Sequence, residues 1–211
     1  LELLRRATRE AGALLIFDEV ISGFRVARGG AAELYGITPD LATFGKIIGG
    51  GMPVGAFGGR RELMEHLAPL GRVYQAGTLS GNPVAMAAGL ATLRVLERDA
   101  VWNRLEALGA ALEEALAPVL AAAPAPARLV RLGSLFWISL QAGDPPRRAD
   151  QLDPAAAKNY AALFHALLER GIALAPSAYE VGFLSAAHTV AHVRRLAEEV
   201  AIALSRGSLD G

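Results

Sequence analysis

The sequence predicts an α/β protein built in two parts. Two short apolar runs, at 13–17 and 40–44, have the length and composition of buried parallel strands. Amphipathic helical patterns alternate with these runs, and such alternation is the pattern of α/β folds. Near residue 100 a glycine-rich first part gives way to a part rich in alanine and leucine. We therefore expect two domains, 1–100 and 101–211.

Residues that are typical of helix ends indicate where the expected elements of the first part begin and end. Gly12 ends the first helical pattern, and Asn82 and Pro83 begin the last one as N-cap and first helical residue. In chain order, the expected elements are a helix at 1–11, a strand at 13–17, a short helix or turn at 31–36, a strand at 40–44, an extended segment at 53–58, and helices at 60–68 and 83–99.

The second part contains a long helix that carries leucine at helical spacing. These leucines are Leu105, Leu108, Leu112 and Leu116, which share one face. The run AAAPAPA at 121–127 breaks the pattern and is typical of a connector. In chain order, the expected elements are a helix at 101–120, a strand at 129–140, a loop rich in proline and arginine at 142–153, a helix at 154–170, a strand at 172–175 and a helix at 189–205.

The composition limits the classes of partner and chemistry. The chain of 211 residues has 21 Lys and Arg against 21 Asp and Glu, so its charge balance favours neither nucleic acid nor an anionic membrane. The absence of cysteine excludes disulfides and thiolate chemistry and is compatible with a reducing compartment. We expect a cytoplasmic protein. Because Leu1 already lies in a helical pattern, we also expect the chain to begin inside a larger protein.

The stretch TFGKIIGGGMP, residues 43–53, places Lys46 just before three consecutive glycines. Ligands of open α/β sheets bind beyond the carboxyl ends of the strands, where both Asp18 and Lys46 should emerge. The alternative is an ordinary ion pair, or two side chains apart on solvated loops. The glycines at 49–51 favour a backbone that approaches a ligand or adopts a positive φ angle. A lysine that is partly desolvated there could hold an aldehyde as a Schiff base.

The stretch YQAGTLSGNP, residues 74–83, places small polar residues directly before a helix. The free amides and the dipole of a helix N-terminus favour an anion such as phosphate. Simple helix capping is the alternative. An aldehyde-holding lysine, a carboxylate for a pyridinium nitrogen and a phosphate seat together are what pyridoxal 5'-phosphate requires.

Four stretches then resemble the aminomutase branch of the class III aminotransferase family: LLIFDEVISGFR, FGKIIGGGMPVGAFGGRRELM, YQAGTLSGNPVAMAAG and GIALAPSAYEVGFLSAAHT. The resemblance implies a pyridoxal-phosphate enzyme of fold type I. Residues 1–100 would be the C-terminal part of its large cofactor domain, and 101–211 its small C-terminal α/β domain. The implied reaction moves an amino group between adjacent carbons, converting glutamate 1-semialdehyde to 5-aminolevulinate for tetrapyrrole synthesis.

The resemblance also implies roles for single residues. Lys46 matches the Schiff-base lysine, which also moves protons, and Asp18 matches the acid that keeps the pyridine nitrogen protonated. Val20 matches a residue that packs on the ring face, and strand alternation would put it on the same side as Asp18. Gly77 and Thr78 match the contact that reaches the phosphate of the neighbouring subunit. The family resemblance therefore implies a homodimer.

Glu180 and Ile21 bear on the choice within the family. By its surroundings Glu180 could be an exposed glutamate between two strands. The resemblance implies instead that it lies near the amino groups of the substrate. Many class III aminotransferases have glutamine where this chain has Ile21, and an aliphatic residue is more typical of the aminomutase.

Two alternatives to the aminomutase stay open. One is a class III aminotransferase of the omega type that acts on another amine, and the other is an inactive fragment. The family's chain is roughly twice as long, and its N-terminal half supplies further cofactor and substrate contacts. This length difference favours an N-terminally truncated fragment whose β-sheet would have an unpaired edge.

Two further features of the sequence receive ordinary structural interpretations. His188 and His192 are one helical turn apart, but no third ligand accompanies them, so we expect no metal site. We interpret one of these histidines as a contact at the start of a helix and the other as a surface residue. Trp102 and Trp137 are expected to be packing residues.

Overall fold

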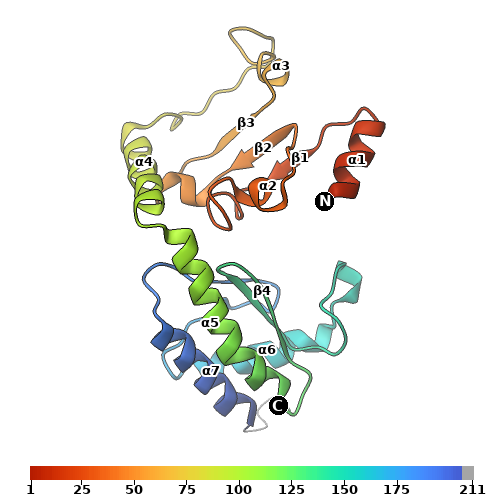
Figure 1. Cartoon of the computed structure of the whole chain (residues 1–211), viewed down its shortest axis with the longest axis vertical. Coiled ribbons are helices and arrows are strands. Elements are labelled where there is room, and N and C mark those ends of the chain that lie inside the picture. Colours follow the sequence, from red (N-terminus) through yellow and green to blue (C-terminus); the bar gives the residue numbers. More distant parts are fainter. Residues whose placement is uncertain (206–211) are drawn as a thin grey trace. The chain divides into compact units, whose positions relative to one another are not determined.

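A computed structural model describes residues 1–205 of the chain. The chain divides into two compact units, of which the first comprises Leu1–Trp102 and the second begins at Asn103 (Figure 1). The boundary lies in the first turn of helix α5 (Val101–Ala121). Each unit is described by itself below.

The first unit contains a three-stranded sheet with the order β1-β2-β3. Its elements are α1 (Glu2–Glu10), β1 (Ile16–Asp18), α2 (Gly30–Tyr35), β2 (Leu41–Phe44), the 3₁₀ helix η1 (Lys46–Gly49), β3 (Ala56–Gly59), α3 (Arg61–Met64) and α4 (Pro83–Arg98). Strands β1 and β2 are parallel, as their apolar composition predicts, whereas β3 is antiparallel to β2. Apart from the helix predicted at 60–68, the predicted elements of this part are present with shifts at their ends.

Helix α3 is shorter than the predicted helix at 60–68. It ends at Met64, and the chain then folds back so that Ala68 donates to the Val73 carbonyl at 2.8 Å and Gly71 donates to the Leu67 carbonyl at 2.8 Å. Pro69 has no N–H to continue a helical ladder. The helical prediction is therefore wrong beyond the first turn.

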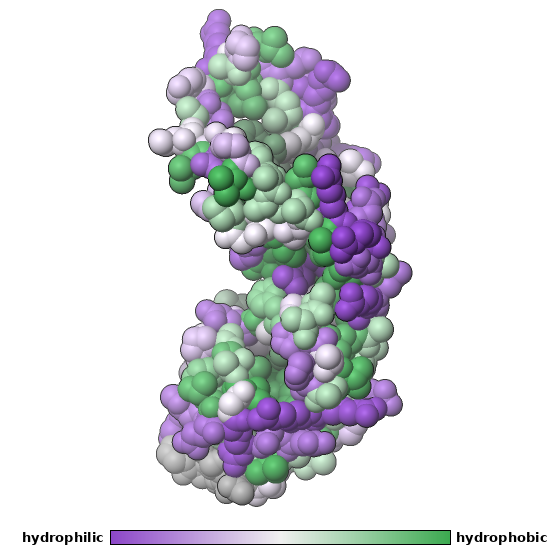
Figure 2. Space-filling model, turned by 90° about the vertical axis from the view of Figure 1, so that its left-hand side faces the viewer, coloured by the Kyte–Doolittle hydropathy of each residue, from purple (hydrophilic) through white to green (hydrophobic). Residues whose placement is uncertain are grey.

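The buried core of the first unit is small. It consists of Leu15, Phe17 and Ile37, with Ala32 and Ala42 packed against it. On the other side of β1 the side chain of Ile16 is 55% exposed. Figure 2 shows hydrophobic residues among polar ones on one face of the molecule. Within the described residues β1 is the end strand of its sheet, which agrees with the predicted unpaired edge.

A buried carboxylate connects three parts of the first unit. Asp40 is 4% exposed, and its Oδ2 accepts from the Leu15 amide at 2.7 Å and pairs with Arg5 of α1 at 2.9 Å. Its Oδ1 accepts from Arg60, next to α3, at 2.9 Å. The Leu15 amide, followed by the Arg5 guanidinium, holds the pKa of Asp40 below its ordinary value. This carboxylate therefore fixes the chain just before both parallel strands.

The second unit contains an antiparallel sheet with the order β4-β5-β6. Its elements are α5, β4 (Arg128–Leu132), β5 (Leu135–Ser139), the 3₁₀ helix η2 (Ala149–Gln151), α6 (Pro154–Leu168), β6 (Gly182–Phe183) and α7 (Val190–Ser205). The four predicted helical leucines of α5 are all buried, at 0 to 7% exposure. Leu108, Leu112 and Leu116 form the core of this unit together with side chains from β5, α6 and α7.

Two strand predictions for the second part are wrong. The single strand predicted at 129–140 is a hairpin, because Gly133 has a positive φ of 59° and reverses the chain between β4 and β5. No strand forms at 172–175. Ile172 and Leu174 pack against the core at alternate positions, so their periodicity reflects burial of an extended segment without ladder pairing.

No helix within residues 1–205 combines the length and apolarity needed to cross a lipid bilayer.

The role of Asp40 can be tested through its pH dependence. Asp40→Asn should lower the melting temperature of the first unit at neutral pH, because Arg5, with a side chain 12% exposed, would lose its anion. Since the folded pKa is lowered, this stabilisation is present above the ordinary aspartate pKa of about 3.9 and is lost as the pH falls further toward the folded value. The measurement is thermal melting from about pH 7 to about pH 3, followed by the fluorescence of Trp102 in a Trp137→Phe background, because Trp137 is the other tryptophan of the chain.

The matched control is Asp144→Asn, because the side chain of Asp144 is fully exposed and its partner Arg128 lies 3.6 Å away. This control should change the melting temperature little at any pH. A difference between wild type and Asp40→Asn that stays constant down to the lowest pH would contradict the account.

Candidate active site

The parallel pairing of β1 with β2 brings Asp18 and Lys46 to the same edge of the sheet. Asp18 is opposite Thr43 in the register, and Lys46 begins η1 three residues after Thr43. The Asp18 Oδ1 accepts from the Val20 amide at 3.0 Å and from the Thr43 hydroxyl at 3.4 Å. Both Asp18 and Lys46 are exposed, and within residues 1–205 no ion pair joins them. The carboxylate and the amine are thus both accessible to a ligand.

The backbone at Lys46 has an uncommon conformation. Its φ angle is +50°, in the left-handed region that side chains other than glycine seldom adopt. Such strain often marks functional positions, where the surrounding structure holds it. The Lys46 side chain is exposed, because η1 begins beyond the end of β2, and the partial desolvation of a Schiff-base lysine stays a prediction.

The three glycines after Lys46 serve packing and turn geometry. A Cβ on Gly50 would lie 2.5 Å from the Ala88 carbonyl oxygen of α4, and Gly50 has a φ of +59°. In the reverse direction, a Cβ on Gly89 would overlap the Ile48 carbonyl oxygen. The predicted positive φ is therefore confirmed, but the close approach is to helix α4. This backbone-to-backbone contact fixes η1, and with it Lys46, against the long helix.

The segment before α4 forms a turn in which Gly77 and Thr78 are exposed. The Gly77 carbonyl accepts from the Ser80 amide at 2.9 Å. The Asn82 side chain accepts from the amides of Val84 and Ala85, at 3.0 and 3.2 Å. The capping interpretation is thus confirmed for Asn82, and the phosphate contact of Gly77 and Thr78 stays a prediction.

Val20 lies outside the strand whose alternation was expected to put it on the same side as Asp18. Strand β1 ends at Asp18, so strand alternation does not extend to Val20, whose amide instead caps the Asp18 carboxylate. Its side chain still lies beside the candidate site, because a Cβ on Gly45 would be 3.2 Å from Val20 Cγ1. Ile21, which follows, is 45% exposed.

Glu180 belongs to the second unit and is exposed. It lies in a segment without regular structure, and its amide donates to the Ser177 carbonyl at 3.2 Å. Glu180 is also one of the residues that line a cavity of about 10 Å³, together with Tyr160 and Trp137. The predicted site residues therefore fall in both units, with Asp18, Val20, Lys46, Gly77 and Thr78 in the first.

Sequence reasoning did not single out Glu19, which is 1% exposed. Its carboxylate accepts from the Ser22 hydroxyl at 2.5 Å and from the amides of Ala31 and Ala32 at 2.9 and 2.8 Å. Glu19 thereby closes the 19–32 segment onto the end of β1 and positions the turn that follows Asp18. The signal was present in the sequence, since consecutive residues of an extended chain point to opposite sides.

The remaining polar features have local structural roles. The Nδ1 atoms of His188 and His192 accept from the amides of Ser185 and Thr189, at 3.0 and 3.1 Å, so both histidines act at the start of α7. Across residues 1–205 no three side chains of metal-ligating type come together. Trp102 and Trp137 do more than pack, because each indole N–H donates to a backbone carbonyl.

An accessible lysine and carboxylate at the carboxyl ends of parallel strands are groups with which an α/β fold can hold a carbonyl compound. The model of the class-III aminotransferase family matches residues 1–196. The chain therefore belongs to the class III aminotransferase family.

Two curated relatives are similar over nearly the whole chain. Glutamate-1-semialdehyde 2,1-aminomutase of Akkermansia muciniphila is 51% identical over 206 residues, which are 98% of this chain and 48% of the relative. The protein of the same name from Pelotomaculum thermopropionicum is 52% identical over 198 residues, 94% of this chain and 45% of the relative. The chain spans about half the length of the curated relatives it matches.

Solved structures agree with the fold. An omega-transaminase from Sphaerobacter thermophilus superposes with a TM-score of 0.88 at 38% identity, over 100% of this chain and 48% of its own. A structure titled as a transaminase with PLP bound gives a TM-score of 0.84 at 33% identity, over 99% of this chain and 47% of its own. The predicted α/β fold of type I is confirmed by these neighbours.

The contact between η1 and α4 generates a prediction. Gly50→Ala should lower the free energy of unfolding by about 1–3 kcal/mol more than Gly51→Ala, because only the first adds a methyl group against backbone. Both glycines have positive φ, so the conformational cost is shared by the two variants. The measurement is urea unfolding followed by Trp102 fluorescence, again in the Trp137→Phe background. Equal losses in the two variants would show that the close approach of α4 does not stabilise η1.

Proposed function

We propose that the chain is the lysine-bearing part of a pyridoxal-phosphate-dependent aminomutase that converts (S)-glutamate 1-semialdehyde to 5-aminolevulinate, a precursor of tetrapyrroles. The observation that carries the proposal is the similarity to relatives of that name, at 51% identity over 98% of the chain. The geometry of the Asp18 and Lys46 edge supports it. We also propose that residues 1–100 belong to the large cofactor domain of such an enzyme and 101–211 to its small domain.

The residues of the first unit fit the cofactor by their chemistry. The Lys46 amine is a nucleophile for an aldehyde, and the Asp18 carboxylate is an acceptor for a protonated ring nitrogen. Both groups are exposed at the same edge, and the Val20 side chain lies next to the backbone between them. When bound, pyridoxal phosphate supplies an aldehyde and an aromatic ring that withdraws electrons from the substrate.

The proposed role of Lys46 is to bind the cofactor aldehyde through Nζ and then to move protons between adjacent substrate carbons. The positive φ of Lys46 and the packing of η1 on α4 would hold this side chain in place. Asp18 would keep the ring nitrogen protonated. Its Oδ1 is already oriented by Val20 and Thr43, which leaves Oδ2 for the ring.

The roles of three other residues and the assembly rest on the family resemblance. Glu180 would lie near the substrate amino groups and act on their protons. Gly77 and Thr78 would contact the phosphate bound by a neighbouring subunit, and their exposure in the turn before α4 is compatible with that role. We therefore propose a homodimer. We also propose that it acts in the cytoplasm.

A class III aminotransferase acting on another amine is the second candidate. The 38% identity to an omega-transaminase at a TM-score of 0.88 favours it. Ile21 and Glu180 favour the aminomutase. Because the chain spans about half of its relatives, an inactive fragment is the third candidate.

The test is turnover of glutamate 1-semialdehyde by the chain supplied with pyridoxal phosphate and no amino donor. We expect 5-aminolevulinate to form, and Lys46→Ala to lower the rate by about 10²–10⁴-fold because a proton-transfer group is lost. The matched control is Lys158→Ala, since Lys158 is the other lysine of the chain and lies on α6. Turnover that requires an external amino donor would support the aminotransferase, and the absence of any turnover would support the inactive fragment.

A further inference from the structure

The segment that carries Glu180 has no regular secondary structure of its own. Residues 172–181, here called the Glu180 segment, lie between the end of α6 and strand β6. Pairing of Gly182 with Phe136 of β5 fixes the chain just after the segment. Its internal hydrogen bonds are short in range, from the amides of Glu180 and Tyr179 to Ser177 at 3.2 Å each. The position of Glu180 must therefore depend on groups outside the segment.

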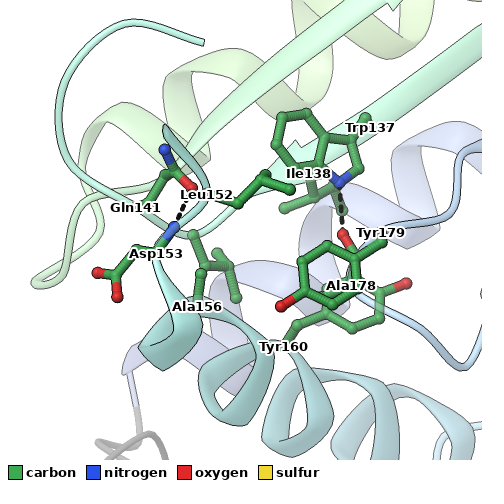
Figure 3. Close-up of a pocket in the computed structure, with 10 residues that line it drawn as sticks. Trp137, Ile138, Gln141, Leu152, Asp153, Ala156, Tyr160, Ala178 and Tyr179 are labelled. Carbon is green, nitrogen blue, oxygen red and sulfur yellow. Dashed lines mark hydrogen bonds between the residues drawn. The ribbon is translucent and has the colours of Figure 1, made fainter. Parts of the chain in front are cut away.

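Two side chains from the core of the second unit contact the backbone of this segment. Tyr160 of α6 donates its hydroxyl to the Ala175 carbonyl at 2.7 Å. Trp137 of β5 donates its indole N–H to the Ala178 carbonyl at 2.7 Å. Figure 3 shows the two aromatic side chains approaching the segment from the strand and from the helix. The two accepting carbonyls flank Ser177, which in turn accepts from the Glu180 amide.

The two donors come from rigid surroundings. Tyr160 is 5% exposed and belongs to the hydrophobic core, and Trp137 lies in the middle of β5 between two buried residues. Side chains packed in this way lose little further entropy when they donate a hydrogen bond. They can therefore hold the segment at a fixed position relative to the sheet and to α6.

Glu180 also lies near the same aromatic pair. It lines a cavity of about 10 Å³ with Trp137 and Tyr160, and that cavity has room for no more than about one water molecule. The cavity is too small for a substrate. Burial, and then the negative charge of Glu180, raise the pKa of Tyr160 above its ordinary value. The tyrosine hydroxyl thus stays protonated and able to donate at neutral pH.

We propose that Trp137 and Tyr160 are positioning residues for Glu180, each holding the backbone of the Glu180 segment through one hydrogen bond. The catalytic meaning of this placement rests on the proposed function of Glu180. The mechanical part of the inference, that the two donors restrain the segment, stands independently of any cofactor or substrate.

The first test measures hydrogen exchange of the chain by mass spectrometry. Tyr160→Phe and Trp137→Phe each remove one donor and keep an aromatic ring. Each should speed amide exchange in residues 172–181 by about 3- to 10-fold, the effect of one lost hydrogen bond. Exchange in the core helices α5 and α7 should not change.

Two matched controls accompany this test. Tyr179→Phe removes a hydroxyl from the segment itself, where the side chain is 58% exposed and makes no hydrogen bond within residues 1–205. Trp102→Phe removes an indole donor, bonded to the Phe24 carbonyl at 3.0 Å, from the first unit. Both should leave exchange in 172–181 unchanged. Unchanged exchange in Tyr160→Phe and Trp137→Phe, or a uniform increase throughout the second unit, would overturn the proposal.

The second test asks whether the two residues act through Glu180. In turnover assays Trp137→Phe should lower kcat with little change in KM, and it should have no further effect when combined with Glu180→Gln. Equal effects in both backgrounds would overturn the positioning role. If Glu180→Gln alone leaves turnover unchanged, the proposed function of Glu180 fails, and the exchange measurement still decides whether the donors hold the segment.

Discussion

The geometry of the candidate site depends first on the buried carboxylate of Asp40. A charge that is 4% exposed needs strong partners, and Asp40 has two arginines and the Leu15 amide. These partners tie α1 and the segment before α3 to the point where both parallel strands begin. Because the strands start from one anchored position, their carboxyl ends reach one edge together. Asp18 lies there opposite Thr43, three residues before Lys46.

A second constraint acts at the other end of β2. Helix α4 approaches η1 so closely that Gly50 and Gly89 have no room for a side chain. This contact places a short, strained turn with Lys46 at its start on a helix of 16 residues. Asn82 caps the same helix, and the exposed Gly77 and Thr78 lie just before that cap. The proposed lysine and the proposed phosphate contact therefore depend on the same helix.

Local signals in the sequence predicted most elements, and tertiary interactions explain the errors. Gly12, Asn82 and Pro83 marked helix ends correctly because capping is decided by adjacent residues. The turn at Gly133 was missed because one glycine within an apolar run gives little local indication of a hairpin. The exposure of Lys46 could not be read from its sequence neighbours, because exposure depends on what packs over the sheet edge. The pattern singled out Asp18 and Lys46, but Glu19 was overlooked although strand alternation places it on the side opposite to Asp18.

Whether the edge of β1 and β2 is a cofactor site can be tested by trapping pyridoxal phosphate on the chain with borohydride and then mapping the modified residue. The sequence contains two lysines, Lys46 and Lys158, so the second is an internal control within the same molecule. The account predicts modification of Lys46 in clear preference to Lys158, and its loss without transfer to Lys158 in Lys46→Ala. Equal modification of the two lysines, or none at Lys46, would contradict the claim that the edge of β1 and β2 is a cofactor site.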